Sequence, residues 1–439
     1  MSNKQIYVAK FGGSSLANAA QMRKVKDIVL ADERRRYVVP SAPGKRSDND
    51  IKVTDMLYDF KSCAESGVGV EDAFEKIKRR YVQIRNDLKL EIKIEDYLDE
   101  VKKDVLNGAS NDYTASRGEY LNGLLLADYL GYEFVDAADV IFFDENDELD
   151  VEKTISVMNG TLKHTERAVI PGFYGSGRND EVITFSRGGS DITGAIVSRS
   201  VMANLYENWT DVSGFLMADP RIVDNPKAIE CITYRELREL SYMGASVLHE
   251  DAVFPVLKVR TPINIKNTNE PGDKGTMIVS RVLDDDNKTI TGIAGKKNFT
   301  VIAIEKNKMN AEVGFGRKVL EALEKNSVSF EHMPSGIDTL SLVISDDEIN
   351  GKLKSVQDDI YKVCKPDSIE VFSNMSLIAT VGRGMRRNIG TASRLFGALA
   401  KNKINIRMID QGSSEINIIV GVANDDFEAA VQAIYTGFE

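Results

Sequence analysis

The sequence predicts an α/β protein in which a mainly parallel sheet lies between helices and is followed by two copies of a smaller module. Three observations support this prediction. The chain has 439 residues, which is too long for one core and fits about three units of ~150 residues. Residues 1–45 alternate as strand, glycine turn, helix and strand, the pattern of a βαβ unit in a parallel sheet. After residue 290 a pattern repeats, since Met309 recurs as Met385, a step of 76 residues.

Composition and charge exclude several classes of protein. The chain is 42% apolar and 28% charged, with a net charge of −11, which argues against nucleic-acid binding because such proteins carry a basic face. Cys63, Cys231 and Cys364 lie far apart without CxxC spacing, which favours reduced thiols over disulfides or a zinc site. The sequence predicts neither a signal peptide nor a membrane segment. We therefore expect a cytoplasmic protein without nucleic-acid or membrane partners.

A glycine pair follows the first expected strand, Ile6-Tyr7-Val8-Ala9. The stretch Lys10-Phe11-Gly12-Gly13-Ser14-Ser15 is called the phosphate cradle below. Its glycines allow a tight turn and bring backbone N–H groups close to an anion, while two hydroxyls and one ammonium add donors. The lysine precedes the glycines, so this is not a Walker A loop. Taken alone, the stretch is more typical of an ordinary strand-to-helix turn with a surface lysine.

The next elements extend the βαβ pattern. A helix is expected over 20–31 and a strand over 37–40, which ends in the polar loop Ser41-Ala42-Pro43-Gly44-Lys45-Arg46. The carboxyl ends of parallel strands share one sheet edge, so this loop is expected beside the cradle. Residues 47–130 are expected to be mostly helical. Their densest charged run, residues 71–103, carries charges of both signs, which indicates a solvated helical surface to which we assign no chemistry.

Two polar strings are expected to open helices within that region, Thr54-Asp55 and Ser116-Arg117-Gly118-Glu119. The remaining expected elements are strands over 133–143, 167–174, 205–209 and 263–266 and helices over 192–203 and 234–243.

A second glycine motif, Ser186-Arg187-Gly188-Gly189-Ser190-Asp191, precedes the helix at 192–203. The free N–H groups and the dipole of a helix start attract an anion. Asp191 has two interpretations. It caps the helix, or it lies between the two glycine loops and holds Lys10 and a metal-bound phosphate in place.

The order of motifs along the chain resembles the aspartate kinases of the amino-acid kinase family over essentially the whole sequence. These motifs are KFGGSS, SAPG, TD, SRGE, SRGGSD, WTDVSG, DPR, MGASVLH and KNTNEPGDKGT. The resemblance implies a three-layer αβα catalytic domain over 1–289 with an eight-stranded, mainly parallel sheet. It implies phosphorylation of the L-aspartate side chain by MgATP to 4-phospho-L-aspartate, the first step toward lysine, threonine and methionine. ATP, with Mg²⁺, is a substrate, and neither an organic prosthetic group nor a metal site of protein side chains is expected.

The resemblance also assigns roles around the acceptor. Lys10 stabilises charge on the transferred γ-phosphoryl group, and Asp191 orients it. Arg187 clamps the substrate α-carboxylate, where a planar bidentate donor is favoured, and Glu119 binds the α-ammonium. The acceptor carboxylate is ionised at neutral pH and needs no general base.

Further substrate and nucleotide contacts follow from the same motifs. Thr54 contacts the substrate through its hydroxyl, and Ser41 lies near the substrate carboxylates. The loop between them is longer than in many relatives. The ATP-binding residues implied are Phe11, Gly12, Gly13, Ser14, Ser15, Thr210, Asp211, Asp219, Arg221 and Lys266.

The repeat after the catalytic domain needs no gap. Met309, Gly314, Ala322, Leu323, Lys325 and Asn326 recur as Met385, Gly390, Ala398, Leu399, Lys401 and Asn402. Each copy resembles the ACT domain, a βαββαβ (ferredoxin-like) amino-acid-sensing module, with copies over 298–370 and 371–439. The strand 290–297 is expected to complete the second copy. The chain carries no dinucleotide-binding region, so we expect a monofunctional enzyme.

The resemblance to ACT domains implies an effector site and an oligomer. The loop 308–314 and the facing loop 335–338 are the candidate pocket, with Met309, Asn310, Gly314, Ser335 and Asp338 as effector residues. The alternative is that these loops are exposed turns at a dimer contact. Lysine is the preferred allosteric inhibitor and threonine the second. ACT edges commonly pair, so a homodimer or a dimer of dimers is expected.

Two other functions compete with a feedback-regulated aspartate kinase. One is a kinase for another carboxylate such as glutamate, since Glu119 and Arg187 suit any α-amino acid. The other is a non-catalytic amino-acid sensor, against which the intact Lys10, Arg187 and Asp191 argue.

Overall fold

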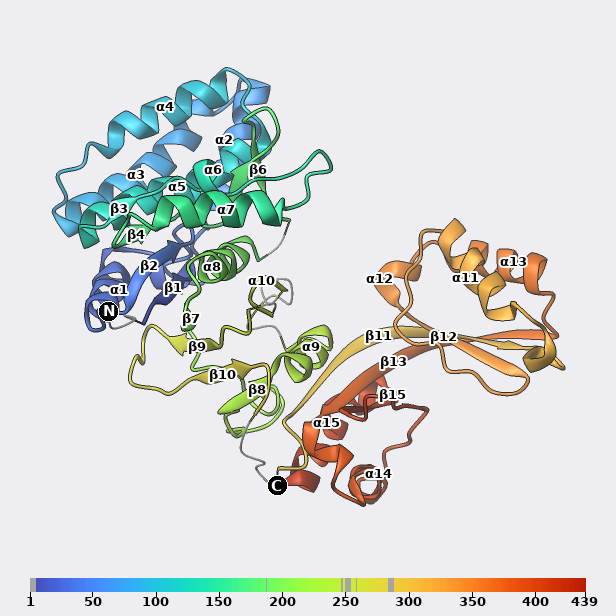
Figure 1. Ribbon diagram of the computed structural model, residues 1–439. Helices are drawn as coiled ribbons and strands as arrows, with labels where there is room; N and C mark the ends of the chain where they lie inside the picture. Colours follow the sequence, from blue (N-terminus) through green and yellow to red (C-terminus); the bar gives the residue numbers. More distant parts are fainter. Residues whose placement is uncertain (1–4, 187, 246–247, 249–253, 258, 283–287) are drawn as a thin grey trace. The chain divides into compact units, whose positions relative to one another are not determined.

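The computed structural model describes residues 5–186, 188–245, 248, 254–257, 259–282 and 288–439. The chain forms two compact units (Figure 1). The first comprises Met1–Phe215, Ala228–Leu237 and Ser246–Leu283. The second comprises Leu216–Lys227, Arg238–Ala245 and Asp284–Glu439.

The first unit is built on an eight-stranded sheet in the order β3-β4-β2-β1-β7-β9-β10-β8. Neighbouring strands run parallel except for β9 and β10, which confirms the prediction of a mainly parallel sheet. The strands are β1 (Tyr7–Phe11), β2 (Arg35–Pro40), β3 (Glu133–Phe134), β4 (Ala168–Val169), β7 (Leu205–Thr210), β8 (Cys231–Thr233), β9 (Ile263–Asn267) and β10 (Thr276–Val279), and a separate hairpin is formed by β5 (Tyr174–Ser176) and β6 (Val182–Thr184).

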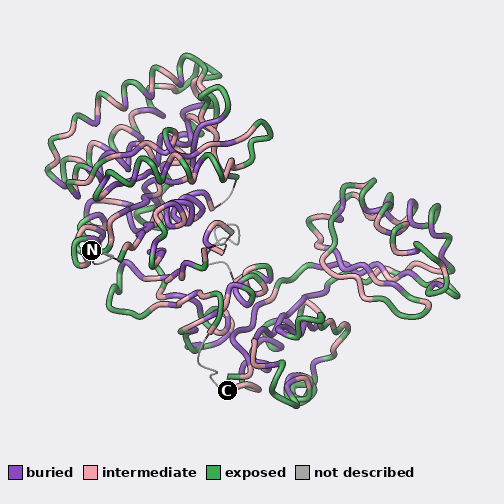
Figure 2. The backbone as a smooth tube through the Cα atoms, viewed as in Figure 1, coloured by how far each residue is buried: buried purple, intermediate pink, exposed green. Residues whose placement is uncertain are grey.

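Helices cover both faces of this sheet. The helices up to α10 are η1 (Ser14–Leu16), α1 (Ala19–Leu30), α2 (Val53–Ser66), α3 (Val70–Leu88), α4 (Ile94–Leu106), α5 (Asn111–Leu130), α6 (Ala137–Val140), α7 (Val151–Leu162), α8 (Gly189–Ser200), α9 (Tyr234–Tyr242) and α10 (Phe254–Leu257). Helix α9 begins in the first unit and ends in the second. On one face α8 lies against β1, β2 and β7, and Figure 2 shows it buried along most of its length. On the other face α1 and α5 pack on the sheet, with α2, α3 and α4 around them (Figure 1).

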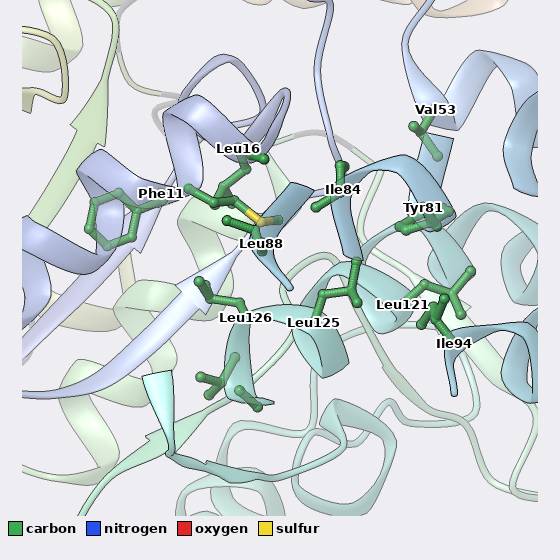
Figure 3. Close-up of a cluster of buried hydrophobic side chains, with 14 of the residues drawn as sticks. Phe11, Leu16, Val53, Tyr81, Ile84, Leu88, Ile94, Leu121, Leu125 and Leu126 are labelled. Carbon is green, nitrogen blue, oxygen red and sulfur yellow. The ribbon is translucent and has the colours of Figure 1, made fainter. Parts of the chain in front are cut away.

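The core of the first unit anchors the start of the chain. Phe11 and Leu16, on either side of the glycine pair, pack with side chains of α3 and α5 such as Ile84 and Leu125 (Figure 3). Burying each such side chain contributes about 1.5–3 kcal/mol. The phosphate cradle is therefore held at both ends by buried apolar residues.

Several expected elements are confirmed and others are wrong. The expected helix over 20–31 is α1, and the strand over 205–209 is β7. The prediction that Ser116 opens a helix is wrong. Helix α5 begins at Asn111, and its cap is Ser110, whose hydroxyl accepts a hydrogen bond from the Tyr113 N–H. The string Ser116-Arg117-Gly118-Glu119 therefore lies inside the helix.

The long strands expected over 133–143 and 167–174 are also wrong. The first is interrupted after β3, because the Asp136 side chain caps α6 by accepting from the Ala138 N–H at 3.0 Å. Beyond α6, Phe142 and Phe143 form isolated β-bridges with Ser176 and Leu149. In the second, β4 ends at Val169, although the N–H groups of Ile170 and Gly172 still donate to carbonyls of β2 at 2.9 and 3.0 Å. Phe173 then adopts a positive φ of 81° before β5. Apolar composition predicted extended structure there, and a local cap and a backbone turn interrupt it.

The second unit contains a five-stranded antiparallel sheet in the order β12-β11-β13-β15-β14 (Figure 1). Its elements are β11 (Gly292–Glu305), η3 (Met309–Ala311), α11 (Phe315–Lys325), β12 (Thr339–Ser345), α12 (Asp346–Ile349), α13 (Leu353–Cys364), β13 (Ser368–Val381), η4 (Arg383–Arg386), α14 (Thr391–Lys401), β14 (Met408–Asp410), β15 (Asn417–Ala423), η5 (Asn424–Asp426) and α15 (Phe427–Phe438). The long strands β11 and β13 each serve both halves of the sheet.

The two halves follow the sequence repeat. In β11, residues 292–296 pair with the end of β13, whereas residues 299–305 pair with β12. Each half has its own apolar core, with Met309 in one and Met385 in the other. Gly314 and Gly390 both precede a helix with positive φ, 82° and 88°. The repeat in the sequence is thus a repeat in structure, while the domain boundaries at 298 and 371 stay a prediction.

Within the described residues, no helix combines the length and the apolar character needed to cross a bilayer.

A buried ion pair fastens β2 to β7 across β1. The Arg35 guanidinium donates to Glu207 from Nε at 2.6 Å and from Nη2 at 3.0 Å, and Trp209 Nε1 donates to the same carboxylate at 3.1 Å. Glu207 is buried.

We predict that Glu207→Gln lowers the free energy of unfolding by about 3 kcal/mol, because it leaves a buried guanidinium without its charge partner. The matched control is Asp32→Asn, which breaks the exposed pair with Arg34 and is expected to cost less than about 1 kcal/mol. Urea denaturation of the full chain measures both. Equal losses in the two variants would contradict a structural role for the buried pair.

Candidate active site

The centre of the candidate site is an ion pair between β1 and α8. Lys10 Nζ lies 2.5 Å from Asp191 Oδ1, and both side chains are largely buried. In the parallel pairing of β1 with β7, Lys10 is opposite Asn208. Asn208 Nδ2 donates to the same Asp191 oxygen at 2.8 Å. One carboxylate therefore joins two strands and the start of a helix.

The structure excludes the capping interpretation of Asp191. The residue that caps α8 is Gly188, with a positive φ of 59°, and Asp191 lies in the first turn. Its backbone carbonyl accepts a hydrogen bond from the Tyr206 hydroxyl at 3.0 Å. Asp191 is therefore held on the Lys10 side and does not cap the helix.

The phosphate cradle has donors that its own fold does not use. The Gly12 N–H donates to the Trp209 carbonyl at 2.9 Å and so extends the sheet. Within the described part of the chain, the N–H groups of Gly13 and Ser14 have no hydrogen-bond partner. These two N–H groups, with the Lys10 ammonium nearby, suit an anion.

The loop after β2 lies directly against the cradle. The Gly44 N–H donates to the Gly13 carbonyl at 2.8 Å. A Cβ on Gly44 would stand 2.6 Å from the Gly13 carbonyl carbon, so a side chain there would force the two backbones apart. The sequence prediction that these loops share one sheet edge agrees with this contact.

Glu119 is a buried carboxylate beside this centre. It is 6% exposed, and its Oε2 has no hydrogen-bond partner within the described residues. Burial raises the pKa of Glu119 to about 7, while a backbone hydrogen bond from Ala42 and the charge of Lys10 act in the opposite direction. A buried carboxylate oxygen without a hydrogen bond is costly, and a ligand with an ammonium group would relieve that cost.

The other residues expected around the acceptor are placed as follows. The Ser41 N–H donates to the Phe11 carbonyl at 3.0 Å, and its carbonyl accepts from Asn122 Nδ2 at 2.6 Å. Thr54 lies in the first turn of α2 and is partly buried. Arg187 lies outside the described residues.

Sequence reasoning missed Asn122 and Asn208. Each is a polar residue buried within an element, Asn122 three residues after Glu119 in α5 and Asn208 inside β7. Buried amides need partners, and a polar residue within an expected strand was the signal available for Asn208.

Two of the residues predicted to bind ATP have buried side chains that contact other residues of the protein. Phe11 is fully buried and stacks on Trp209. The Ser15 hydroxyl is buried and lies 2.7 Å from that of Thr268. If these two residues meet the nucleotide, their backbones do so.

The remaining predicted ATP residues lie in both units. Thr210 ends β7, and its hydroxyl donates to Asp211 at 3.2 Å. Lys266 Nζ donates to the Asp273 carbonyl at 2.6 Å, and burial lowers the pKa of this lysine. Asp219 and Arg221 belong to the second unit, where they form an ion pair at 2.6 Å.

The two loops expected to bind an effector are in contact within the second unit. The Lys308 N–H donates to Asp338 Oδ1 at 2.7 Å, and the Asn310 N–H donates to the Ile337 carbonyl at 3.1 Å. Ser335 pairs with Leu340 beside them, and Gly314 precedes α11. Met309 is 5% exposed and packs in the core, so its side chain does not line a pocket.

No group of three or more His, Cys, Asp or Glu side chains able to hold a metal occurs among the residues that the structure describes.

Comparison with known proteins identifies the family. The model of the amino acid kinase family matches residues 5–267, and an ACT domain model matches residues 378–438. The sequence is 39% identical to aspartokinase 3 of Bacillus subtilis, over 98% of each chain. The chain belongs to the aspartokinases. The predicted family and the expected amino-acid kinase fold are thereby confirmed, and the protein is a kinase.

Solved structures agree with this assignment. The crystal structure of Clostridium acetobutylicum aspartate kinase is 57% identical, with a TM-score of 0.91 over 99% of this chain and 100% of the other. E. coli aspartokinase III, 25% identical over 99% of each chain, has a TM-score of 0.77 in its complex with aspartate and ADP. Its complex with lysine and aspartate has a TM-score of 0.75.

Proposed function

We propose that this aspartokinase transfers the γ-phosphoryl group of MgATP to the side-chain carboxylate of L-aspartate, giving 4-phospho-L-aspartate. The observation that carries the proposal is the buried carboxylate of Glu119, whose Oε2 receives no hydrogen bond from the described residues and which lies close enough to Lys10 for their charges to interact. It offers an ammonium site beside an anion site. The complex of E. coli aspartokinase III with aspartate and ADP supports the same pair of substrates.

The transfer needs charge neutralisation more than covalent chemistry from the protein. A carboxylate oxygen of aspartate attacks the γ-phosphorus, the bond to the bridging oxygen breaks, and ADP leaves. Lys10 and the N–H groups of Gly13 and Ser14 stabilise the charge on the transferred group. Asp191 and Asn208 hold Lys10 in position. The attacking carboxylate is already ionised, so no general base is required.

The acceptor is held at its amino-acid end. Glu119 binds the α-ammonium and Arg187 the α-carboxylate, with Ser41 and Thr54 next to them. Holding both α-groups fixes the direction of the side chain, so the distance to the γ-phosphorus selects aspartate over the longer glutamate.

The nucleotide contacts are proposed for Gly12, Gly13, Ser14, Thr210, Asp211, Asp219, Arg221 and Lys266, with Mg²⁺ arriving on ATP.

Regulation is proposed for the second unit. Residues 298–370 and 371–439, with 290–297, are assigned as two ACT domains that pair copies of the chain into a homodimer or a dimer of dimers. The effector site comprises Asn310, Gly314, Ser335 and Asp338. Lysine is the preferred effector, with threonine second, and the complex of E. coli aspartokinase III with lysine supports this order.

A chain segment that carries nucleotide residues is fastened to the second ACT half. The segment Leu216–Lys227 contributes Val223 to the core of that half, and the Lys227 N–H donates to the Tyr435 hydroxyl at 3.0 Å. Asp219 and Arg221 lie on this segment. A change of packing in the sensor half therefore acts directly on the chain that bears them.

The proposed activity is tested by trapping the acyl phosphate with hydroxylamine. The wild-type chain with MgATP is expected to form hydroxamate from L-aspartate, with a kcat/KM about 10–200-fold lower for L-glutamate, which differs by one methylene. A preference for glutamate supports the alternative acceptor. Absence of product from both amino acids supports a non-catalytic sensor.

Lys10→Ala is predicted to lower kcat by about 10²–10³-fold, because the ammonium stabilises charge that develops in the transition state. The KM for aspartate is expected to change little, since Lys10 does not hold the amino-acid end. The matched control is Lys24→Ala, which removes a lysine on α1 whose ammonium donates to Asn269. It should leave both constants unchanged. Steady-state kinetics measure them, and an unaltered kcat in Lys10→Ala contradicts the assignment.

The pH dependence of kcat/KM for aspartate should follow the protonation of the Glu119 carboxyl. Because burial raises its pKa to about 7, the neutral form dominates below that pH and cannot pair with the substrate ammonium. We expect kcat/KM for aspartate to fall about tenfold per pH unit well below pH 7, and to level off above it. Glu119→Gln should lower kcat/KM and remove this limb. The measured range, roughly pH 5.5 to 8, brackets this pKa. A wild-type kcat/KM that stays constant over that range argues against Glu119 as the ammonium-binding residue.

Asp338→Asn is predicted to raise the lysine concentration for half-inhibition by about tenfold or more, because a charge-assisted hydrogen bond to the effector ammonium is lost. The matched control is Ser414→Ala, at the equivalent position of the second copy. An inhibition panel of lysine, threonine and methionine, alone and combined, measures the effect. If Asp338→Asn responds to every amino acid as the wild type does, Asp338 is not an effector residue.

A further inference from the structure

Arg80 is a buried cation in the helical region to which the sequence assigned no chemistry. It lies on α3 with its side chain 2% exposed, and its Nε has no hydrogen-bond partner within the described residues. Arginine is rarely buried this fully, and burying a charge is unfavourable unless it is paired and hydrogen-bonded. The guanidinium must therefore be held by contacts of its own.

Those contacts go to the backbone of both loops of the candidate site. Arg80 Nη1 lies 3.5 Å from the Ala17 carbonyl, just after the phosphate cradle. Its Nη2 lies 3.3 Å from the Gly44 carbonyl and 3.1 Å from the Ile51 carbonyl, at the two ends of the loop that leads from Ser41 to Thr54. One planar donor group thus contacts the backbone after the phosphate cradle and both ends of this loop.

The same loop supplies the counter-charge. Arg80 Nη2 donates to Asp50 Oδ2 at 2.7 Å, and Arg46 Nε donates to the same oxygen at 2.8 Å. The hydrogen bonds from Arg46 and then from Arg80 lower the pKa of Asp50. The carboxylate therefore stays ionised and keeps the loop closed on the guanidinium.

The position of the Ser41–Thr54 loop affects the phosphate cradle because the two are in direct contact. Gly44, whose carbonyl faces Arg80, also donates its N–H to the Gly13 carbonyl and leaves no space for a side chain. A shift of Gly44 therefore shifts Gly13, whose N–H is one of the donors proposed for the phosphate.

We propose that Arg80 is a positioning residue that sets the Ser41–Thr54 loop against the phosphate cradle and thereby determines affinity for the amino-acid substrate. The effect on affinity for the amino-acid substrate rests on the proposed function, whereas the effect on the position of the loop does not. A guanidinium is suited to the task because it presents several donors in one rigid plane, whereas a lysine ammonium cannot reach the same three carbonyls from one stem.

The test compares Arg80→Lys, Asp50→Asn and the control Arg85→Lys in the full chain. Arg85 lies on the same helix, is largely buried and pairs with Glu95 on α4, and it contacts neither loop. Two measurements are made: the KM for aspartate with kcat, and the rate of tryptic cleavage after Lys45 and Arg46, followed by mass spectrometry. Melting temperatures of all variants are recorded alongside.

Arg80→Lys is expected to raise the KM for aspartate about tenfold or more, since small misplacements of positioning groups have large effects. It should also speed cleavage of the loop, with Asp50→Asn changing both quantities in the same direction by less. Arg85→Lys should leave both unchanged even where it lowers the melting temperature equally. A loss of stability in Arg80→Lys with unaltered KM and cleavage overturns the proposal.

The failure of the proposed function gives a different result. A wild-type chain that forms no acyl phosphate from aspartate refutes the function, while the cleavage rates still decide whether Arg80 holds the loop.

Discussion

The ion pair between Lys10 and Asp191 is the interaction on which the rest of the site depends. It joins the strand that carries the phosphate cradle to the helix that follows the second glycine motif, and Asn208 completes it from the neighbouring strand. Removing two charges from water is costly, and apolar residues would often stabilise such a position more. A pair in this setting marks a place where the protein needs a fixed charge. In the proposed mechanism that charge is applied to the transferred phosphoryl group.

The other parts of the site are arranged around this pair by helices of the opposite face. Glu119 lies on α5, whose carbonyl at Gly118 accepts from the buried Tyr81 hydroxyl of α3 at 2.8 Å. The adjacent Arg80 holds the substrate loop. Helix α3 thus supports the proposed ammonium site and the proposed phosphate site through two consecutive residues, although no catalytic group is proposed on it. A rigid scaffold that positions loops from behind is the common way in which folds carry sites.

Local patterns predicted most of the alternating β and α elements of the first unit, because glycine turns and apolar periodicity act over a few residues. The miscalled start of α5 has a local cause as well, since Ser110 provided a better cap than Ser116. The contacts of Asn208 and Asn122 could not be predicted from local patterns, because they join residues far apart in sequence. The many charged residues around Arg80 predicted that it is exposed to solvent. It lies three residues after the buried Ile77 and four before the buried Ile84, on the same face of the helix. That spacing, more than the surrounding charges, was the signal of its burial.

In the proposed mechanism, Asp191 acts through Lys10 on the transferred phosphoryl group. Single-turnover rapid-quench measurements with γ-labelled MgATP, comparing the wild type with Asp191→Asn, test it most directly, with calorimetry giving the Kd for MgATP. In Asp191→Asn the transfer rate is expected to fall by about 100-fold, as when one transition-state donor is lost, while the Kd is expected to change less than about fivefold. An unchanged transfer rate in Asp191→Asn would contradict it.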